Sequence, residues 1–205
     1  MLIQNESPMK TLQIYEHLER IANLLRTDTR KSGIDKGLQP VQLEALHYLD
    51  CCNRYSNTPA SVADYLGLTK GTVSQTLGVL ESAGLIDKRP DEKDRRVVHL
   101  VLTEKGKTTL DATIPPQVLV NALERVAQSD QQIVLDALNR ILRSLQVANR
   151  LKSFGECQTC RHHRIEEGQG RRCGLTGEVL QAEDIVKICR EHASPEIQAG
   201  HETSL

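Results

Sequence analysis

The stretch LTKGTVSQTLGVLESAGLIDKRPDEKDRRVVHLVLTEKG, residues 68–106, decides the fold of this chain. Thr69 stands where it can cap a helix, and Gly84 stands where it can end one. Two short runs rich in branched residues follow, 85–89 and 96–103, with a polar, charged segment between them. Such a pair of runs is typical of a β-hairpin. The stretch therefore predicts a helix followed by a projecting hairpin.

The residues before this stretch supply a second short helix and a scaffold. PASVADYLG, residues 59–67, predicts a helix that ends at its glycine, and Pro40 is well placed as the first residue of a helix running to about Arg54. Two short helices with a tight connection, followed by a hairpin, are the layout of a winged helix-turn-helix. We therefore predict a mainly α fold with a small β wing, with the winged-helix core at about residues 40–105.

Long helices are predicted on both sides of this core. Residues 9–30 carry apolar side chains at three- and four-residue spacing, and a helix from Ser129 to about Leu151 alternates them in heptad fashion. The segment 31–37, with its two glycines, is expected to end the first helix. Such stripes suit helices that pack along a partner, so the sequence predicts a helical dimerisation region. The stripe residues are Ile14, Leu18, Ile21 and Leu25, and Val134, Leu138, Ile141, Leu145 and Ala148.

The second helix of the short pair presents residues suited to the DNA major groove. With its apolar side chains facing the core, a projection at 100° per residue turns small and polar side chains outward. Gln75 can bond adenine bidentately, and Thr72 can touch a thymine methyl group. The hairpin loop adds five basic residues, and a wing can place an arginine in the minor groove. The candidate DNA-contacting residues are Lys70, Gly71, Thr72, Ser74, Gln75, Thr76, Arg89, Lys93, Arg95 and Arg96.

The same part of the chain resembles a known family. DRRVVHLVLTEKG, residues 94–106, matches the DxRxxxLxLTxxG signature of MarR-type regulators, and residues 68–86 are similar to their recognition helix and the start of their wing. The resemblance covers roughly residues 10–150. It implies a homodimer whose first and last long helices intertwine, with two winged domains reading a near-palindromic operator. It also implies that Asp94 braces Arg96 within the wing.

Composition narrows the functional classes. The chain has 205 residues, a formal net charge of −1, no Trp and one Phe, so DNA contacts must come from a local basic patch. No apolar run approaches the roughly 20 residues needed to span a bilayer, and the N-terminus lacks a secretory signal. We therefore expect a cytoplasmic protein that makes no membrane contact. Since no phosphate-cradling loop, zinc-protease motif or nucleophile elbow occurs, we expect no enzyme.

Four cysteines lie in the last quarter of the chain. We assign residues 153–205 to a cysteine-rich metal-binding tail and residues 1–152 to a DNA-binding and dimerisation domain. The spacing of the thiols is CxxC, twelve residues, Cys, fifteen residues, Cys. In a reducing compartment, clustered cysteines are more often metal ligands or redox thiols than structural disulfides. The predicted ligands are Cys157, Cys160, Cys173 and Cys189.

Three chemistries fit this spacing. A 4Fe-4S cluster takes four thiolates spread over more backbone than a single ion needs. Zn²⁺ would take the four thiolates, or Cys157, Cys160 and Cys189 with His192. A thiol–disulfide switch at the CxxC is the third. We favour the cluster because a regulator without an evident ligand pocket needs a signal. By contrast Cys52, on an apolar helix face, is expected to be a buried core residue.

The sequence therefore predicts a DNA-binding transcriptional regulator, with repression as the preferred action, whose operator affinity responds to the C-terminal site acting as a redox or metal sensor. Two alternatives stay open. One is an electron-transfer accessory protein that uses the winged helix as a docking module. The other is a MarR-type regulator with a purely structural zinc tail.

Overall fold

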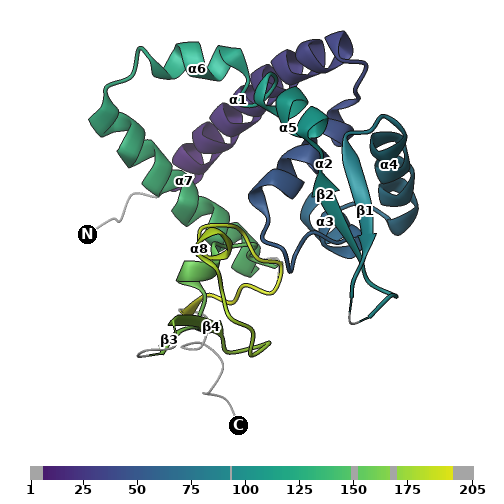
Figure 1. Cartoon of the computed structure of the whole chain (residues 1–205). Coiled ribbons are helices and arrows are strands. Elements are labelled where there is room, and N and C mark those ends of the chain that lie inside the picture. Colours follow the sequence, from purple (N-terminus) through teal and green to yellow (C-terminus); the bar gives the residue numbers. More distant parts are fainter. Residues whose placement is uncertain (1–6, 93, 149–151, 167–169, 196–205) are drawn as a thin grey trace.

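The computed structural model of the chain describes residues 7–92, 94–148, 152–166 and 170–195. Helices dominate, and each of two short hairpins forms its own sheet (Figure 1). In chain order the elements are α1 (Ser7–Asp35), α2 (Pro40–Cys51), α3 (Pro59–Leu66), α4 (Lys70–Ser82), β1 (Ile86–Pro90), β2 (Val98–Leu102), α5 (Glu104–Asp111), α6 (Gln117–Leu123), α7 (Gln128–Ala148), the short 3-10 helix η1 (Cys157–Thr159), β3 (His163–Glu166), β4 (Gly170–Cys173) and α8 (Ala182–Ile185).

The winged-helix core is built from α2, α3, α4 and the antiparallel hairpin β1–β2. The hairpin register runs from Ile86 opposite Leu102 to Pro90 opposite Val98. All of these elements bury apolar side chains in one cluster, whose fully buried members include Leu43, Leu46, Tyr48, Val62, Val73, Leu77, Leu80, Ile86 and Leu100. Because one cluster joins the helices to the hairpin, the packing fixes α4 relative to the wing. The predicted winged helix-turn-helix is confirmed.

The predicted ends of α4 are also confirmed. Thr69 caps its first turn, since Oγ1 accepts a hydrogen bond from the Thr72 backbone N–H at 3.2 Å. Gly84 follows the helix with a φ of +69°, in the left-handed region that side chains rarely adopt. The chain therefore leaves α4 sharply, and Ile86 begins the first strand of the wing.

The first helix is longer than the sequence suggested. The segment 31–37 was expected to end it, but α1 continues through Gly33 to Asp35. A Cβ at Gly33 would lie 2.9 Å from the Leu38 carbonyl oxygen and 2.9 Å from a Leu43 methyl group. The glycine therefore serves close packing inside the helix instead of breaking it.

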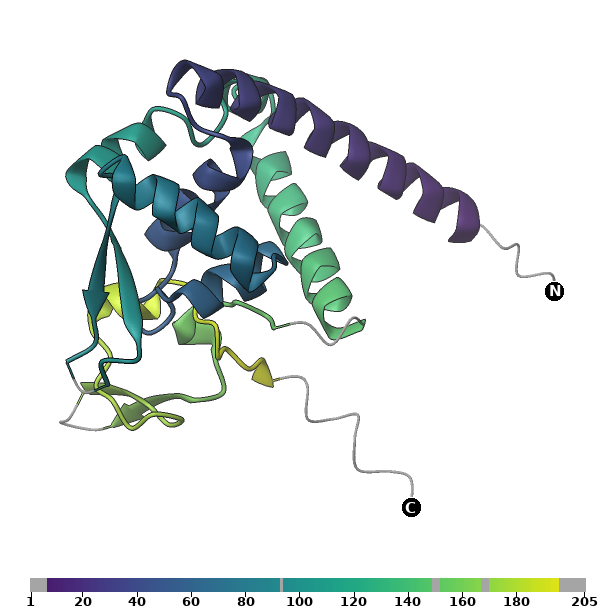
Figure 2. The same cartoon turned by 90° about the vertical axis from the view of Figure 1, so that its right-hand side faces the viewer.

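The apolar stripes of α1 and α7 are largely uncovered in the single chain. Ile14 and Ile21 in α1 are each 50% exposed, and Leu138 and Leu145 in α7 are 43% and 53% exposed. No residue of α7 is buried. Figure 2 shows α1 extending well beyond the winged-helix core toward its N-terminal end. The predicted end of α7 near Leu151 lies outside the described residues, and within the described ranges no helix is long and apolar enough to cross a membrane.

The tail folds into a small unit that rests on the winged-helix core. Strands β3 and β4 pair antiparallel, from His163 opposite Cys173 to Glu166 opposite Gly170. A small buried cluster of Cys157, Leu180 and Ile185 lies behind them, with Tyr55 from the α2–α3 connection packed against it. The tail therefore packs its apolar side chains partly against the core, because it has too few large apolar side chains to form a core of its own.

Candidate nucleic-acid interface and cysteine site

The exposed face of α4 carries most of the predicted base-reading residues. Lys70, Gly71, Thr72, Ser74 and Gln75 are all exposed. The apolar side chains Val73, Leu77 and Leu80 face the core, as the helical projection predicted. Val79 extends the exposed face, at 49% exposure. The face is therefore small, polar and accessible, as entry into a major groove requires.

Thr76 is the exception. It was expected to flank the exposed face, but it is only 6% exposed and lies among the buried residues of α4. Thr76 follows Val73 by three residues and precedes Leu80 by four, so it belongs to the inward stripe of the helix. The prediction that Thr76 flanks the exposed face was wrong, because its side chain is buried with the inward stripe of α4.

The wing is organised by acidic residues that hold its arginines. Asp94 accepts hydrogen bonds from Arg96 Nε at 3.0 Å, from Arg96 Nη2 at 3.2 Å and from the Arg96 backbone N–H at 3.0 Å. The side-chain bond from Arg96, followed by the backbone bond, lowers the pKa of Asp94. The bracing of Arg96 by Asp94 is therefore present in the wing. Arg95 and Arg89 are exposed as well, with Arg89 3.3 Å from Asp87, whereas Lys93 lies outside the described residues.

Hydrogen bonds connect the wing to the helix-turn-helix. His99 in β2 lies with Nδ1 2.6 Å from Asn57 Oδ1, in the α2–α3 connection, and with Nε2 3.1 Å from Asp91 Oδ2, in the wing loop. The Leu100 backbone N–H also donates to the Asn57 carbonyl oxygen at 2.7 Å. These bonds fix the position of the wing relative to the connection between α2 and α3.

The four tail cysteines line a single cavity of about 50 Å³. Burial, followed by the nearby thiols of Cys189, Cys173 and Cys160, raises the pKa of Cys157 to about 11. The four thiols, separated by up to 32 residues of sequence, are thus neighbours in space. Within the described ranges, however, no three His, Cys, Asp or Glu side chains are grouped closely enough to hold a metal ion as they stand.

The backbone around the cysteines forms two linked turns. In the first, the Cys160 N–H donates to the Cys157 carbonyl oxygen at 3.1 Å; in the second, the His192 N–H donates to the Cys189 carbonyl oxygen at 3.2 Å. Cys160 Sγ accepts bonds from the His162 N–H at 3.5 Å and from the Ala193 N–H at 3.4 Å. Two backbone N–H groups therefore converge on the Cys160 sulfur, and hydrogen bonds to a sulfur ligand are one way in which a protein tunes a bound metal centre.

The histidines are placed differently from the thiols. His192, the alternative zinc ligand, has Nδ1 2.6 Å from Ser153 Oγ and Nε2 3.0 Å from Thr159 Oγ1. Both ring nitrogens of His192 are therefore within hydrogen-bond distance of hydroxyl groups. His192 is also not among the residues that line the cysteine cavity. His163 does line it, but its Nδ1 lies 3.2 Å from the Cys157 carbonyl oxygen. The described geometry therefore brings the four cysteines together and leaves His192 outside.

Cys51 and Cys52 belong to the core side. Cys52 is 4% exposed in the main apolar cluster, as predicted, and burial raises its pKa to about 12. Cys51 Sγ lies 3.4 Å from His47 Nε2, within α2. All six cysteines are free thiols.

The cysteine tail docks on the α2–α3 corner of the core. Ile188 pairs with Cys52 as a parallel bridge, in which the Asn53 N–H donates to the Ile188 carbonyl oxygen at 2.9 Å and the Ile188 N–H donates to the Cys51 carbonyl oxygen at 3.0 Å. Phe154, the one phenylalanine of the chain, packs its ring 6.0 Å from Tyr48 and 5.1 Å from Tyr65, centroid to centroid. The tail is therefore joined to the winged helix by both backbone pairing and aromatic packing.

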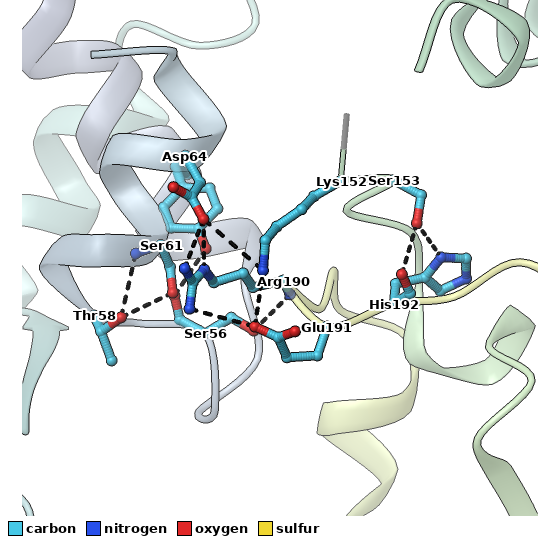
Figure 3. Close-up of polar contacts among 10 residues, drawn as sticks. Ser56, Thr58, Ser61, Asp64, Lys152, Ser153, Arg190, Glu191 and His192 are labelled. Carbon is cyan, nitrogen blue, oxygen red and sulfur yellow. Dashed lines mark hydrogen bonds and ion pairs between the residues drawn. The ribbon is translucent and has the colours of Figure 1, made fainter. Parts of the chain in front are cut away.

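A polar network continues this junction onto α3 (Figure 3). Arg190, next to Cys189, holds Asp64 of α3 through Nη2 at 2.7 Å and Nε at 2.8 Å. Its backbone N–H donates to Ser56 Oγ at 2.9 Å, and Lys152 Nζ lies 3.0 Å from Glu191 and 3.9 Å from Asp64. Cys189 is therefore adjacent in sequence to Arg190, which forms an ion pair with α3, the first helix of the helix-turn-helix.

Comparison with known proteins agrees with this description. A family model described as MarR family matches residues 36–97, which contain α2, α3, α4 and β1. The Escherichia coli (strain K12) transcriptional repressor MprA is 31% identical over 110 residues, which cover 54% of this chain and 61% of MprA. This chain therefore matches less than two thirds of the length of MprA. The HTH-type transcriptional repressor NicR of Pseudomonas putida (strain KT2440) is 31% identical over 107 residues, covering 49% of this chain and 67% of NicR.

Solved structures share the fold. The crystal structure of the S. aureus MepR–DNA complex, at 24% identity, covers 64% of this chain and 96% of that chain with a TM-score of 0.53. The fold and the relatives define the class of this chain as winged-helix proteins similar to transcriptional regulators. Within that class, this chain belongs to the MarR family.

Proposed function

We propose that this protein is a transcriptional repressor that binds a near-palindromic DNA operator as a homodimer in the cytoplasm. The observation that carries the proposal is the exposure of the polar face of α4 together with that of the wing arginines Arg89, Arg95 and Arg96. MprA and NicR are named as repressors, and MepR has been solved on DNA. In this assignment Gln75 and Thr72 read base edges, while Lys70 and the wing arginines contact phosphates or the minor groove.

The dimer half of the proposal rests on the uncovered stripes of α1 and α7. Apolar side chains at helical spacing that stay exposed in one chain are the expected surface for a second copy. A dimer of this kind would present two copies of α4 to successive turns of the major groove. Half-sites would then lie roughly 34–36 Å apart, centre to centre.

Selection from random duplex DNA by the full-length protein tests this function. We expect enrichment of one palindromic sequence, with an affinity that falls steeply as salt rises. A protein that only uses the winged helix to dock on another protein would enrich nothing. That result would favour the electron-transfer alternative.

We also propose that the four cysteines hold a 4Fe-4S cluster. The proposal rests on two features: all four thiols line one cavity, and Cys160 Sγ accepts two backbone N–H bonds. A 4Fe-4S cluster is held by four thiolates, which these cysteines can supply from separate segments of the tail. When bound, the group would supply one-electron redox chemistry or lability toward oxidants.

A cluster here would act on DNA binding through α3. Cys189 is flanked by Ile188, which pairs with the end of α2, and by Arg190, which holds Asp64 in α3. Loss or oxidation of the cluster would free this segment and so change how α3 supports α4. The contacts of the tail with α2 and α3 give a direct connection from the cysteine site to the winged helix.

A further inference from the structure

Asn53 is a buried side chain with one hydrogen-bond donor left over. It is 1% exposed and directly follows Cys52. Its backbone N–H donates to Ile188, its carbonyl oxygen accepts from the Ser56 N–H at 2.9 Å, and its Oδ1 accepts from the Tyr55 N–H at 3.2 Å. The Oδ1 bond fixes which way the amide is turned, because an N–H needs an oxygen acceptor. Nδ2 is then the remaining group.

That nitrogen stands apart from other buried polar atoms. Among the residues that the structure describes, Asn53 Nδ2 is the one buried side-chain nitrogen or oxygen without a hydrogen-bond partner. Buried donors are nearly always paired, because leaving one unpaired forfeits its bond to water with nothing in return. An unpaired donor at a cavity wall therefore points to a partner that binds in the cavity.

Asn53 lines two cavities, which differ in volume and in how open they are to solvent. The larger, of about 330 Å³, is the more open to solvent. The smaller is lined by all four tail cysteines, together with polar residues such as His163 and Glu191. Because Nδ2 is shielded from solvent, we assign it to the smaller and less open of the two cavities. The backbone bond from Asn53 to Ile188 also places it one residue from the ligand Cys189.

We propose that Asn53 Nδ2 donates a hydrogen bond to a sulfur of the group held by Cys157, Cys160, Cys173 and Cys189, so that the winged-helix core contributes a positioning residue to the sensing site. This inference rests on the proposed cluster. A hydrogen bond to a cluster sulfur stabilises the more negative, reduced state and raises the reduction potential. Asn53 would then couple the electronic state of the cluster directly to the corner between α2 and α3.

The test compares reduction potentials in the full-length protein, reconstituted without oxygen from Fe²⁺ and sulfide and titrated with dithionite in the presence of redox dyes. Asn53→Leu removes the donor without adding charge, and Asn53→Asp removes it while keeping an acceptor for Tyr55. We expect both to lower the potential so that the reduction equilibrium shifts about tenfold, or about 59 mV for a one-electron couple. A merely structural role would change stability but not the potential.

Asn57→Asp is the matched control. It adds the same charge four residues further along the connection, keeps an acceptor for His99, and should leave the potential close to that of the unaltered protein. Unchanged potentials in both Asn53 variants would overturn the inference alone, and a lowered apo-protein stability beside them would leave Asn53 with a structural role only. An unaltered protein that takes up no cluster would overturn the proposed cofactor as well. If Asn53→Leu does not fold, Asn53→Asp, which is closest in shape, decides the outcome.

Discussion

Gln75 lies near the middle of the exposed face of α4, and its amide can make a bidentate contact to one adenine. We predict that Gln75→Ala relaxes base preference at one position in each half-site and costs about 1–3 kcal/mol of binding free energy on the selected operator. Thr76→Ser, at the buried position on the same helix, should leave base preference intact and serves as the control. Base preference measured by selection would decide. An unchanged preference in Gln75→Ala would mean that α4 enters the groove with another face.

Arg96 makes a different kind of contact. Its side chain is 91% exposed yet oriented by Asp94. We predict that Arg96→Ala weakens binding to all sequences alike and lowers the salt slope by about one, because a phosphate or minor-groove cation is lost. Asp94 would then be left as an unpaired negative charge facing the DNA backbone. Adding Asp94→Asn to Arg96→Ala should therefore recover part of the affinity, and failure to recover any would remove Asp94 from this role.

At the level of elements, α1 and α7 carry apolar stripes that stay exposed in the single chain. We predict that Leu138→Glu with Leu145→Glu makes the protein monomeric or aggregation-prone and abolishes operator binding, because an unpaired charge is costly to bury. Asn139→Glu with Ser144→Glu adds the same charge about 100–120° away around the helix and should leave the dimer intact. Sedimentation analysis separates these outcomes. A stable dimer carrying both leucine changes would place α7 outside the interface.

The junction between α3 and the tail is the second element-scale feature. Asp64 and Arg190 are 37% and 29% exposed, so solvent screening limits their pair to about 0.5–1 kcal/mol of coupling. We predict that Asp64→Arg and Arg190→Asp each loosen the tail, seen as faster hydrogen exchange around Ile188, and that the double exchange restores part of the protection. The Lys107–Asp50 pair, which does not involve the tail, gives the control exchange. Additive effects of the two changes would show that the pair does not hold the tail.

The winged helix was predictable because its signals are local. Caps such as Thr69, left-handed glycines such as Gly84 and runs of branched residues in the strands each indicate structure within a few residues. The prediction that the segment with Gly33 ends the first helix was wrong, because Gly33 allows close packing against Leu38 and Leu43, which no local sequence pattern reveals. Arg190–Asp64 and the unpaired amide of Asn53 depend on chain segments more than a hundred residues apart coming together. The sequence held no signal for either beyond residue type.

For the molecule as a whole, the proposed regulation requires that the four cysteines take up a cluster. We predict that Ser at Cys157, Cys160, Cys173 or Cys189 abolishes cluster incorporation, while Ser at Cys51 leaves about four irons per chain. Iron, sulfide and zinc analysis of protein purified without oxygen provides the measurement. Colourless protein with one zinc per chain would replace the cluster with a structural metal.

The most direct test of the account is the operator affinity of one preparation measured with the cluster present and after its removal. Because Cys189, one of the proposed ligands, adjoins both the Ile188 pairing to α2 and the Arg190 contact to α3, we predict a difference of about 5- to 150-fold, the usual range of coupling between two sites. Linkage further requires that operator DNA shift the stability of the cluster by the same factor. Equal affinities of the two forms would contradict the account and leave a repressor whose tail takes no part in regulation.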